Sequence, residues 1–265
     1  MNCPNFIRFD RDAEIKKPEW VLPGLRGGQV GLVTAPGGTG KSYLLLEIAM
    51  SVAAGKTLIP GLDVAYAGKV GLLNFEDDEF DIQQRGNAIL RYFSDIEPAE
   101  NLFVASMVGE TLNLLDSRGE VMHGAVKWLQ GQCEGMRLVV LDPLSHIHTA
   151  DENSASQMSR LVQVLKNVGQ ATGTAILVAH HTGKNAVLNG QGGLQQSARG
   201  SSALVDASRV VITMERPKNS DSYSLLLTWA KINGVAPIRP VALKRLLSGV
   251  LVVGEPTGGG MRYAR

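Results

Sequence analysis

The sequence predicts an α/β domain with a mostly parallel central sheet, flanking helices, and antiparallel strands added at its C-terminal end. From residue 29 on, short β-branched or leucine-rich runs alternate with amphipathic stretches of helical length, a pattern typical of parallel strands joined by helices. The chain has 265 residues, of which 44% are hydrophobic, and this is enough apolar material for a full core. A glycine-rich loop joins the first of these strands to the first helix.

The first part of the chain supplies the parallel strands. We expect strands at residues 30–34, 69–75, 102–106, 138–141 and 175–179. We expect helices at about 41–54, 80–93, 120–134 and 154–171. Each helix is long enough to make a right-handed crossover between two parallel strands.

The composition changes after Lys184. Residues 185–202 are rich in Gly, Gln, Asn and Ser and lack apolar periodicity, so they are expected to form a long exposed loop. A loop of this length in a compact domain points to a functional role. Strand-like runs follow at 209–214, 223–231, 241–244 and 250–253. The turn-rich stretches between them favour antiparallel strands that extend the sheet.

The composition also excludes several classes of protein. The 26 Lys and Arg residues nearly balance the 25 Asp and Glu residues, so the net charge of +1 gives no global attraction to nucleic acid or to an acidic membrane. Two cysteines, Cys3 and Cys133, exclude a disulfide framework and indicate a reducing compartment. Charged residues interrupt the first 20 residues, and no uncharged apolar run approaches the roughly 18 residues needed to cross a bilayer. The sequence predicts a soluble cytoplasmic protein with no membrane partner.

The strongest motif is a phosphate-binding loop between the first expected strand and the first expected helix. It reads Ala35-Pro36-Gly37-Gly38-Thr39-Gly40-Lys41-Ser42. Glycines permit a tight turn whose backbone N–H groups point inward, and the following helix brings the positive end of its dipole to the same place. We expect residues 36–42 to bind ATP, with Lys41 at the β- and γ-phosphates and Ser42 as a ligand of Mg²⁺. Ala35 replaces the first glycine of the general pattern, but its small side chain keeps the turn feasible.

Two further strands end in acidic residues. The apolar run 138–141 is followed by Asp142, which we expect opposite the loop, holding the Mg²⁺ shell, because strand ends converge on the ligand crevice of an α/β sheet. The run 70–75 is followed by Glu76, a candidate for orienting and deprotonating the water that attacks the γ-phosphate. The alternative is that these acids cap the segments that follow. The three acids after Glu76 also suit the first turn of a helix.

Two later stretches complete a recognisable order of motifs. They read Ala179-His180-His181-Thr182-Gly183-Lys184 and Ser197-Ala198-Arg199-Gly200-Ser201-Ser202-Ala203-Leu204-Val205-Asp206. With the phosphate loop, Glu76 and Asp142, they make the chain resemble the RepA-type hexameric replicative helicases of plasmids. More broadly, the chain is similar to the AAA-type branch of RecA-like ATPases. The likeness runs from about Trp20 to Pro237 and includes the entry segment 21–25.

This resemblance implies a RecA-like P-loop NTPase fold and a domain organisation. It implies an ATPase domain over residues 20–255, preceded by an arm at 1–19 and followed by a flexible tail at 256–265. It also implies a homohexameric ring that binds ATP between neighbouring subunits and passes single-stranded DNA through its centre, as an ATP-dependent helicase or translocase of plasmid or phage replication. Loading or initiation would require other proteins.

The resemblance also assigns roles to individual residues. His180 would sense the γ-phosphate and relay hydrolysis to the loop that follows; its alternative is an ordinary strand-end histidine. Arg209 would act as an arginine finger on the neighbouring subunit's ATP, and Lys231 would be a second cation acting in the same way. The alternative for Arg209 is a charge at a strand edge.

DNA contact is assigned to Lys184 and Arg199, the cations of the expected loop. That loop carries no aromatic residue, whereas single-strand binders combine basic grooves with stacking side chains. Arg199 could equally contact phosphate or pair with a loop carboxylate. A second hypothesis therefore stays open, a RecA-like regulatory or scaffold ATPase that unwinds nothing, and a third is a recombinase-like filament.

Overall fold

The computed structural model describes residues 9, 11, 17–98, 100–181, 202–218 and 220–254. Most of the expected loop, with Lys184 and Arg199, lies outside the described residues, as do the tail and most of the arm. No helix within the described ranges is both long and apolar enough to span a lipid bilayer.

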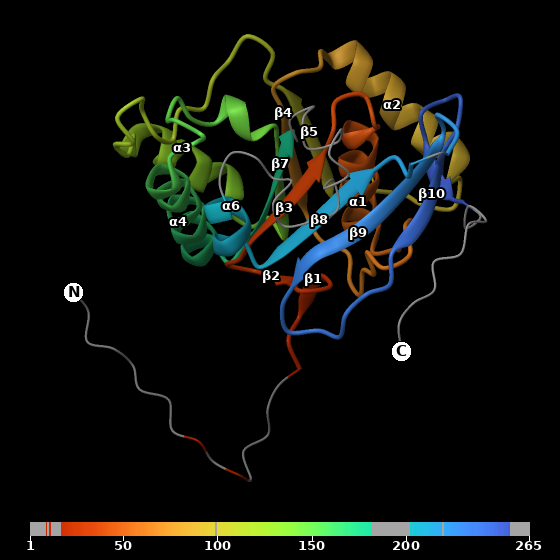
Figure 1. The fold of residues 1–265 in the computed structure, drawn as a ribbon, viewed down its shortest axis with the longest axis horizontal. Helices are drawn as coiled ribbons and strands as arrows, with labels where there is room; N and C mark the ends of the chain where they lie inside the picture. Colours follow the sequence, from red (N-terminus) through yellow and green to blue (C-terminus); the bar gives the residue numbers. More distant parts are fainter. Residues whose placement is uncertain are drawn as a thin grey trace.

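Within the described residues the chain builds one nine-stranded sheet in the order β11-β10-β9-β8-β3-β7-β6-β4-β5 (Figure 1). The parallel strands are β3 (Val30–Ala35), β4 (Val70–Asn74), β5 (Leu102–Ser106), β6 (Leu138–Asp142), β7 (Ala175–His181) and β8 (Val210–Glu215). The antiparallel strands β9 (Ser224–Ile232), β10 (Val241–Arg245) and β11 (Leu251–Val253) continue the sheet beyond β8. The predicted mostly parallel sheet with antiparallel strands at its C-terminal end is confirmed.

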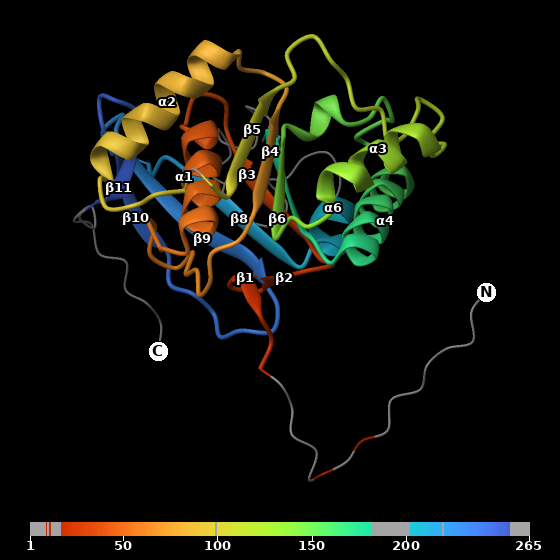
Figure 2. The same ribbon diagram turned by 180° about the vertical axis from the view of Figure 1, so that it is seen from behind.

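Helices cover both faces of the sheet (Figures 1 and 2). On one face lie α1 (Lys41–Ala54) and α2 (Glu79–Tyr92), and on the other lie α3 (His123–Cys133), α4 (Ala155–Thr172) and the short α6 (Ser202–Ala207). Two buried apolar clusters follow from this arrangement, since successive strand residues point to opposite faces. Leu177 and Ala179 of β7 belong to the cluster that contains the buried residues of α1, whereas Ile176 and Val178 belong to the cluster with α4.

The helix boundaries follow local sequence signals. The Asp78 carboxylate accepts a hydrogen bond from Asp81 N (2.9 Å), so Asp78 caps α2 as an acid at a helix start should. Ser154 caps α4 in the same way, and Gly173 ends α4 with a φ of +75°. The buried residues Leu161, Leu165 and Val168 form the apolar stripe that packs α4 on the sheet.

Three features differ from the sequence prediction. Strand β7 continues through His181, two residues beyond the expected end, so both histidines are strand residues. Ser202 begins α6 rather than ending the loop, because Leu204 and Val205 are buried and give the segment a core contact. A short hairpin of β1 (Trp20–Leu22) and β2 (Leu25–Arg26) precedes β3, where the sequence indicated only an entry segment. A one-turn 3₁₀ helix, η1 (Leu144–His146), follows β6.

Candidate functional site

The glycine-rich loop lies where β3 ends and α1 begins. Gly38 and Gly40 adopt φ values of +75° and +102°, a backbone region that favours glycine. A Cβ at either position would meet no neighbour closer than 3.6 Å, so backbone conformation rather than space requires glycine there. The Thr39 hydroxyl donates to the Pro36 carbonyl (2.7 Å) and closes the turn. The loop therefore has the shape of a phosphate cradle at a helix N-terminus.

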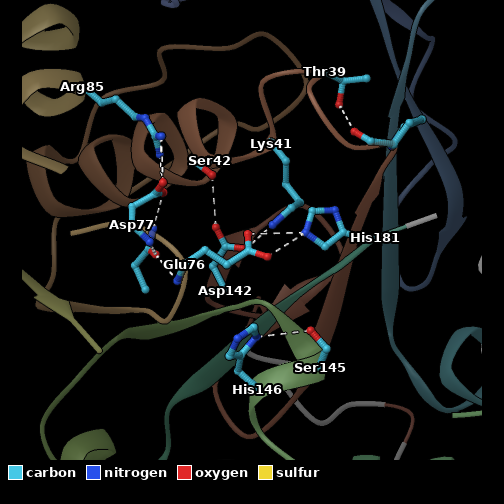
Figure 3. Close-up of polar contacts among 12 residues, drawn as sticks. Thr39, Lys41, Ser42, Glu76, Asp77, Arg85, Asp142, Ser145, His146 and His181 are labelled. Atoms are coloured by element: carbon cyan, nitrogen blue, oxygen red, sulfur yellow. Dashed lines mark hydrogen bonds and ion pairs between the residues drawn. The ribbon is translucent and has the colours of Figure 1, made fainter. Parts of the chain in front are cut away.

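Three predicted residues meet at this loop (Figure 3). The Lys41 ammonium contacts the Asp142 carboxylate, and Ser42 Oγ donates to the other carboxylate oxygen, Oδ2 (3.4 Å). Lys41 and Asp142 are 5% and 1% exposed, so each charge depends on the other for compensation. Asp142 is the last residue of β6, which places its carboxylate at the same edge of the sheet as the loop.

These groups can also hold a cation. The Ser42 hydroxyl and the Asp142 carboxylate lie side by side and offer oxygen atoms, the donor type that Mg²⁺ prefers. The donor chemistry therefore fits a Mg²⁺ ion bound together with nucleotide.

Glu76 approaches the loop from the end of β4 and faces a histidine. His181 Nε2 lies 3.3 Å and 3.4 Å from the two Glu76 carboxylate oxygens (Figure 3). Both side chains are partly exposed, and both line the cavity of ≈ 220 Å³ beside Lys41 and Ser42. A carboxylate and an imidazole at this position can handle the proton of a bound water.

The two histidines at the end of β7 do not share a face. His181 has the orientation of Ala179, toward α1 and the loop, whereas His180 is 4% exposed and has the orientation of Val178, toward the α4 face. This placement corrects the expectation that His180 faces the phosphates: the histidine at the cavity is His181. The sequence contained the signal, since the alternation of a strand that includes both residues separates them, but its expected end at residue 179 concealed it.

Asn74 fixes the backbone around Glu76. Its Oδ1 accepts hydrogen bonds from the N–H groups of Glu76 (2.9 Å) and Asp77 (2.8 Å), and its Nδ2 donates to the Asp77 carboxylate (2.9 Å). Asp77 in turn holds Arg85 through two guanidinium contacts. Burial by itself would raise the pKa of Asp77, but the hydrogen bonds from Arg85 and Asn74 keep it below its usual value. The turn after β4 is therefore locked, with its acid ionised.

A wall of arginines and one tyrosine closes the other side of the cavity. The guanidinium carbons of Arg85 and Arg245 each lie 5.9 Å from the centre of the Tyr43 ring. Arg245 and Arg216 both donate to the Gly38 carbonyl, at 3.2 Å and 3.1 Å. Sequence reasoning missed all four residues. Tyr43 stands next to the motif, but only the packing of α2 and β10 against α1 shows that the arginines reach it.

Comparison with known proteins agrees with this geometry. The family model of an AAA domain matches residues 4–187, which is well over half of the chain. The chain belongs to the AAA domain family. A DNA helicase/primase of Enterobacteria phage T3 is 27% identical over 223 residues, which cover 77% of this chain and 38% of that protein. The chain thus spans little more than a third of the length of this relative.

Two solved structures share the fold of this AAA domain. The ATPase domain of G40P superimposes with a TM-score of 0.60 at 15% identity and covers 87% of this chain and 86% of that one. A RadB recombinase superimposes with a TM-score of 0.56 at 14% identity, covering 87% of this chain and 93% of that one. The expected RecA-like fold is confirmed, whereas a specific kinship with RepA-type helicases stays a prediction.

The two remaining cations of this AAA domain lie at the opposite edge of the sheet. Arg209 is exposed just before β8, and its backbone N–H donates to the Val30 carbonyl (2.8 Å) at the start of β3. Lys231 lies across from Val211 and donates to the carbonyls of Val205 (3.1 Å) and Asp206 (2.7 Å). Burial lowers the pKa of Lys231, and the charge of Arg209 nearby lowers it further, although Asp206 opposes the shift.

The length of β3 keeps these cations away from the chain's own loop. β3 has 6 residues, or roughly 20 Å, between the Arg209 edge and the phosphate loop. The structure therefore does not bring Arg209 or Lys231 into the cavity of its own chain.

Proposed function

We propose that the chain is an ATP-hydrolysing motor of the replicative-helicase type, which works as a ring on single-stranded DNA. The observation that carries the proposal is a division between the two edges of the sheet. One edge holds Lys41, Ser42, Asp142 and Glu76 around one cavity, and the other presents Arg209 and Lys231 away from it. Such an arrangement works when a neighbouring copy supplies the missing cations, and the ring that the resemblance implies would provide that neighbour.

Nucleotide binding rests on the paired groups of the loop. The loop N–H groups and Lys41 would bind the β- and γ-phosphates, so the Lys41 contact with Asp142 in the free chain would give way to a contact with phosphate. Ser42 and Asp142 would hold Mg²⁺, which neutralises charge on the phosphate oxygens. Tyr43, Arg85 and Arg245 form the side of the cavity away from Glu76 and would contact the rest of the nucleotide.

Hydrolysis would use Glu76 and His181. Glu76 accepts the proton of the attacking water, which approaches the γ-phosphate in line with the departing ADP. The Asn74 contacts hold the Glu76 backbone at the distance this role requires. His181 shares the Glu76 carboxylate and is the last residue of β7 before the loop that carries Lys184, so it could relay hydrolysis to that loop.

The neighbouring copy would complete the site. Arg209, exposed and without a carboxylate hydrogen bond among the described residues, would reach the γ-phosphate on the next subunit and neutralise charge in the transition state. Lys231 would support it, since its ammonium lies close enough to Arg209 for their charges to interact.

DNA binding is the part of the proposal with the least support from the described residues. Lys184 and Arg199 would line the centre of the ring, where repeated weak contacts add up. The helicase/primase relative supports a nucleic-acid substrate. The net charge of +1 and a loop with few cations instead favour the alternative, a regulatory ATPase that recruits partner proteins without unwinding DNA.

Steady-state ATP hydrolysis separates the two proposals. The rate should be measured with and without single-stranded DNA, over protein concentrations that span assembly. A motor should hydrolyse ATP several-fold faster when single strands are present. Hydrolysis that ignores DNA would keep the nucleotide site and overturn the helicase proposal in favour of the regulatory ATPase.

A further inference from the structure

An apolar hollow at the edge of the sheet has no role in the proposed nucleotide site. It measures ≈ 380 Å³ and lies between β4, β5 and the end of α3. Its lining is almost entirely apolar, and the residues used below are Leu73, Phe103, Ala105, Gln132, Met136 and Val139. We call this the β5 hollow. Trp128, 40% exposed and one helical turn before Gln132, extends the apolar surface along α3.

The β5 hollow adjoins an unpaired strand edge. β5 is the terminal strand of the sheet on this side and, within the described residues, pairs only with β4. Figure 2 shows β5 between the two layers of helices. Phe103, in the middle of β5, leaves 48% of its surface in solvent. An exposed strand edge beside an apolar hollow is the arrangement that accepts an added strand, with main-chain hydrogen bonds for affinity and side-chain pockets for specificity.

The segment before β1 carries a matching set of side chains. Its sequence includes Phe6-Ile7-Arg8-Phe9, and Phe9 is 100% exposed in the single chain. In an extended segment Ile7 and Phe9 would lie on one face and Arg8 on the other. The 11 residues from Phe9 to Trp20 span at most about 40 Å, so length does not prevent a contact with a nearby surface. The hollow and Phe9 are nevertheless both uncovered in the single chain.

We propose that the β5 hollow receives the segment 5–9 of a second copy of this chain. The segment would lie along the free edge of β5, with Phe9 and Ile7 against Phe103, Ala105 and Met136. Each copy would then offer one segment and one hollow, which is a head-to-tail contact of the kind that closes into rings. This inference rests on the ring of the proposed function and names the surface that holds the ring together.

Two kinds of variant test the proposal. I7S/F9S removes the apolar face of the segment, and Gln132→Arg places a charged side chain at the mouth of the hollow without altering a buried position. Phe103→Ser is a second hollow variant. Leu247→Ser, which removes an apolar side chain that is 91% exposed elsewhere, is the matched control. Circular dichroism checks that each variant folds, and sedimentation velocity over a range of protein concentrations measures assembly.

The expected results are specific to a head-to-tail contact. Either kind of variant should raise the concentration at which half of the protein assembles by at least tenfold, and Leu247→Ser should leave it unchanged. A mixture of I7S/F9S with Gln132→Arg should stop at dimers, because one intact segment meets one intact hollow and neither chain can extend further.

Three outcomes overturn the proposal. Folded variants that assemble like the wild type would show that this surface does not hold the ring. A mixture that contains only monomers would show that the segment docks within its own chain, if at all. A wild-type chain that stays monomeric at every concentration would overturn both this inference and the ring itself, whereas variants that leave wild-type rings intact overturn this inference alone.

Discussion

The two edges of the parallel sheet treat charge in different ways. At the carboxyl edge each charged group of the cavity has an opposite partner within the chain: Lys41 with Asp142, Glu76 with His181, and Arg85 with Asp77. At the amino edge Lys231 donates to main-chain carbonyls, and Arg209 is exposed. The first edge is a preassembled site. The second presents cations whose strongest interactions are still to be made, as expected of a surface that meets an anion on another molecule.

The largest expected effect comes from disabling one edge at a time. Lys41→Ala and Arg209→Ala should each reduce ATP hydrolysis by about 10³-fold, because the first removes a phosphate contact and the second removes charge compensation in the transition state. A mixture of the two should regain part of the rate, since some interfaces then pair an intact loop with an intact Arg209. Steady-state hydrolysis of the mixture measures this.

The control for this experiment is Arg91→Ala, which removes an exposed arginine on α2 outside the cavity. It should hydrolyse ATP at the wild-type rate. Demonstrated mixed assembly without any recovery of hydrolysis would contradict the assignment of Arg209 to a neighbouring site and would break the contrast between the edges.

The second prediction sharpens the carboxyl edge itself. Glu76→Gln should lower kcat by about 10²-fold or more and leave nucleotide affinity nearly intact, because the amide cannot accept the proton of water. His181→Asn should lower the rate less, about tenfold, and should weaken its response to single strands.

His180 provides the matched comparison for His181. His180→Asn should lower the melting temperature and leave the DNA response of the folded protein unchanged, because His180 is buried on the α4 face. Equal loss of the DNA response in both histidine variants would contradict the separation of the two residues by strand alternation.

The third prediction concerns the arginine and tyrosine wall. Arg85→Ala should raise KM for ATP several-fold with a smaller change in kcat, since Arg85 lines the cavity away from Glu76. Arg85→Lys should recover little of the affinity, because an ammonium cannot reproduce the two-pronged contact with Asp77. A change in kcat alone would place Arg85 in the hydrolytic step instead.

The smallest expected effect is on stability, at a carboxyl group that lacks the pairing of its edge. Glu47 of α1 is buried and accepts from Leu251 N (2.8 Å), and one of its oxygens has no partner in the described structure. Burial raises the pKa of Glu47 to about 8, although the Leu251 N–H opposes the shift. The native state therefore keeps a proton that the unfolded chain releases above its pKa of 4.5, and this contribution to stability falls as pH rises from about 4.5 to 8.

Thermal unfolding at several pH values tests this assignment. Glu47→Gln keeps the acceptor for Leu251 and cannot ionise, so the difference in melting temperature between the variant and the wild type should change in favour of the variant by a few degrees as pH rises to 8. A difference that stays constant with pH would show that Glu47 is ionised in the native state at neutral pH.

Much of the fold was readable from local sequence because its elements follow local signals. The helix at 41–54 and the strand at 102–106 were predicted to the residue, since a glycine-rich turn starts the first and turn-forming residues bound the second. Lys41, Ser42, Asp142 and Glu76 could be brought together from sequence because the carboxyl ends of parallel strands meet at one edge. The β1–β2 hairpin escaped because its strands have only 3 and 2 residues, too few for a period to show.

The sequence by itself determined the phosphate loop, the acidic strand ends and the mixed sheet, because strand period, glycine turns and strand-end acids act over a few neighbouring residues. Only the tertiary structure decided that His181 rather than His180 faces Glu76, that arginines from α2 and β10 meet at Tyr43, and that Arg209 and Lys231 share the far edge. Each of these depends on where a strand ends or on which elements become neighbours in the sheet. That is set by the packing of the whole core and leaves no local trace in the sequence.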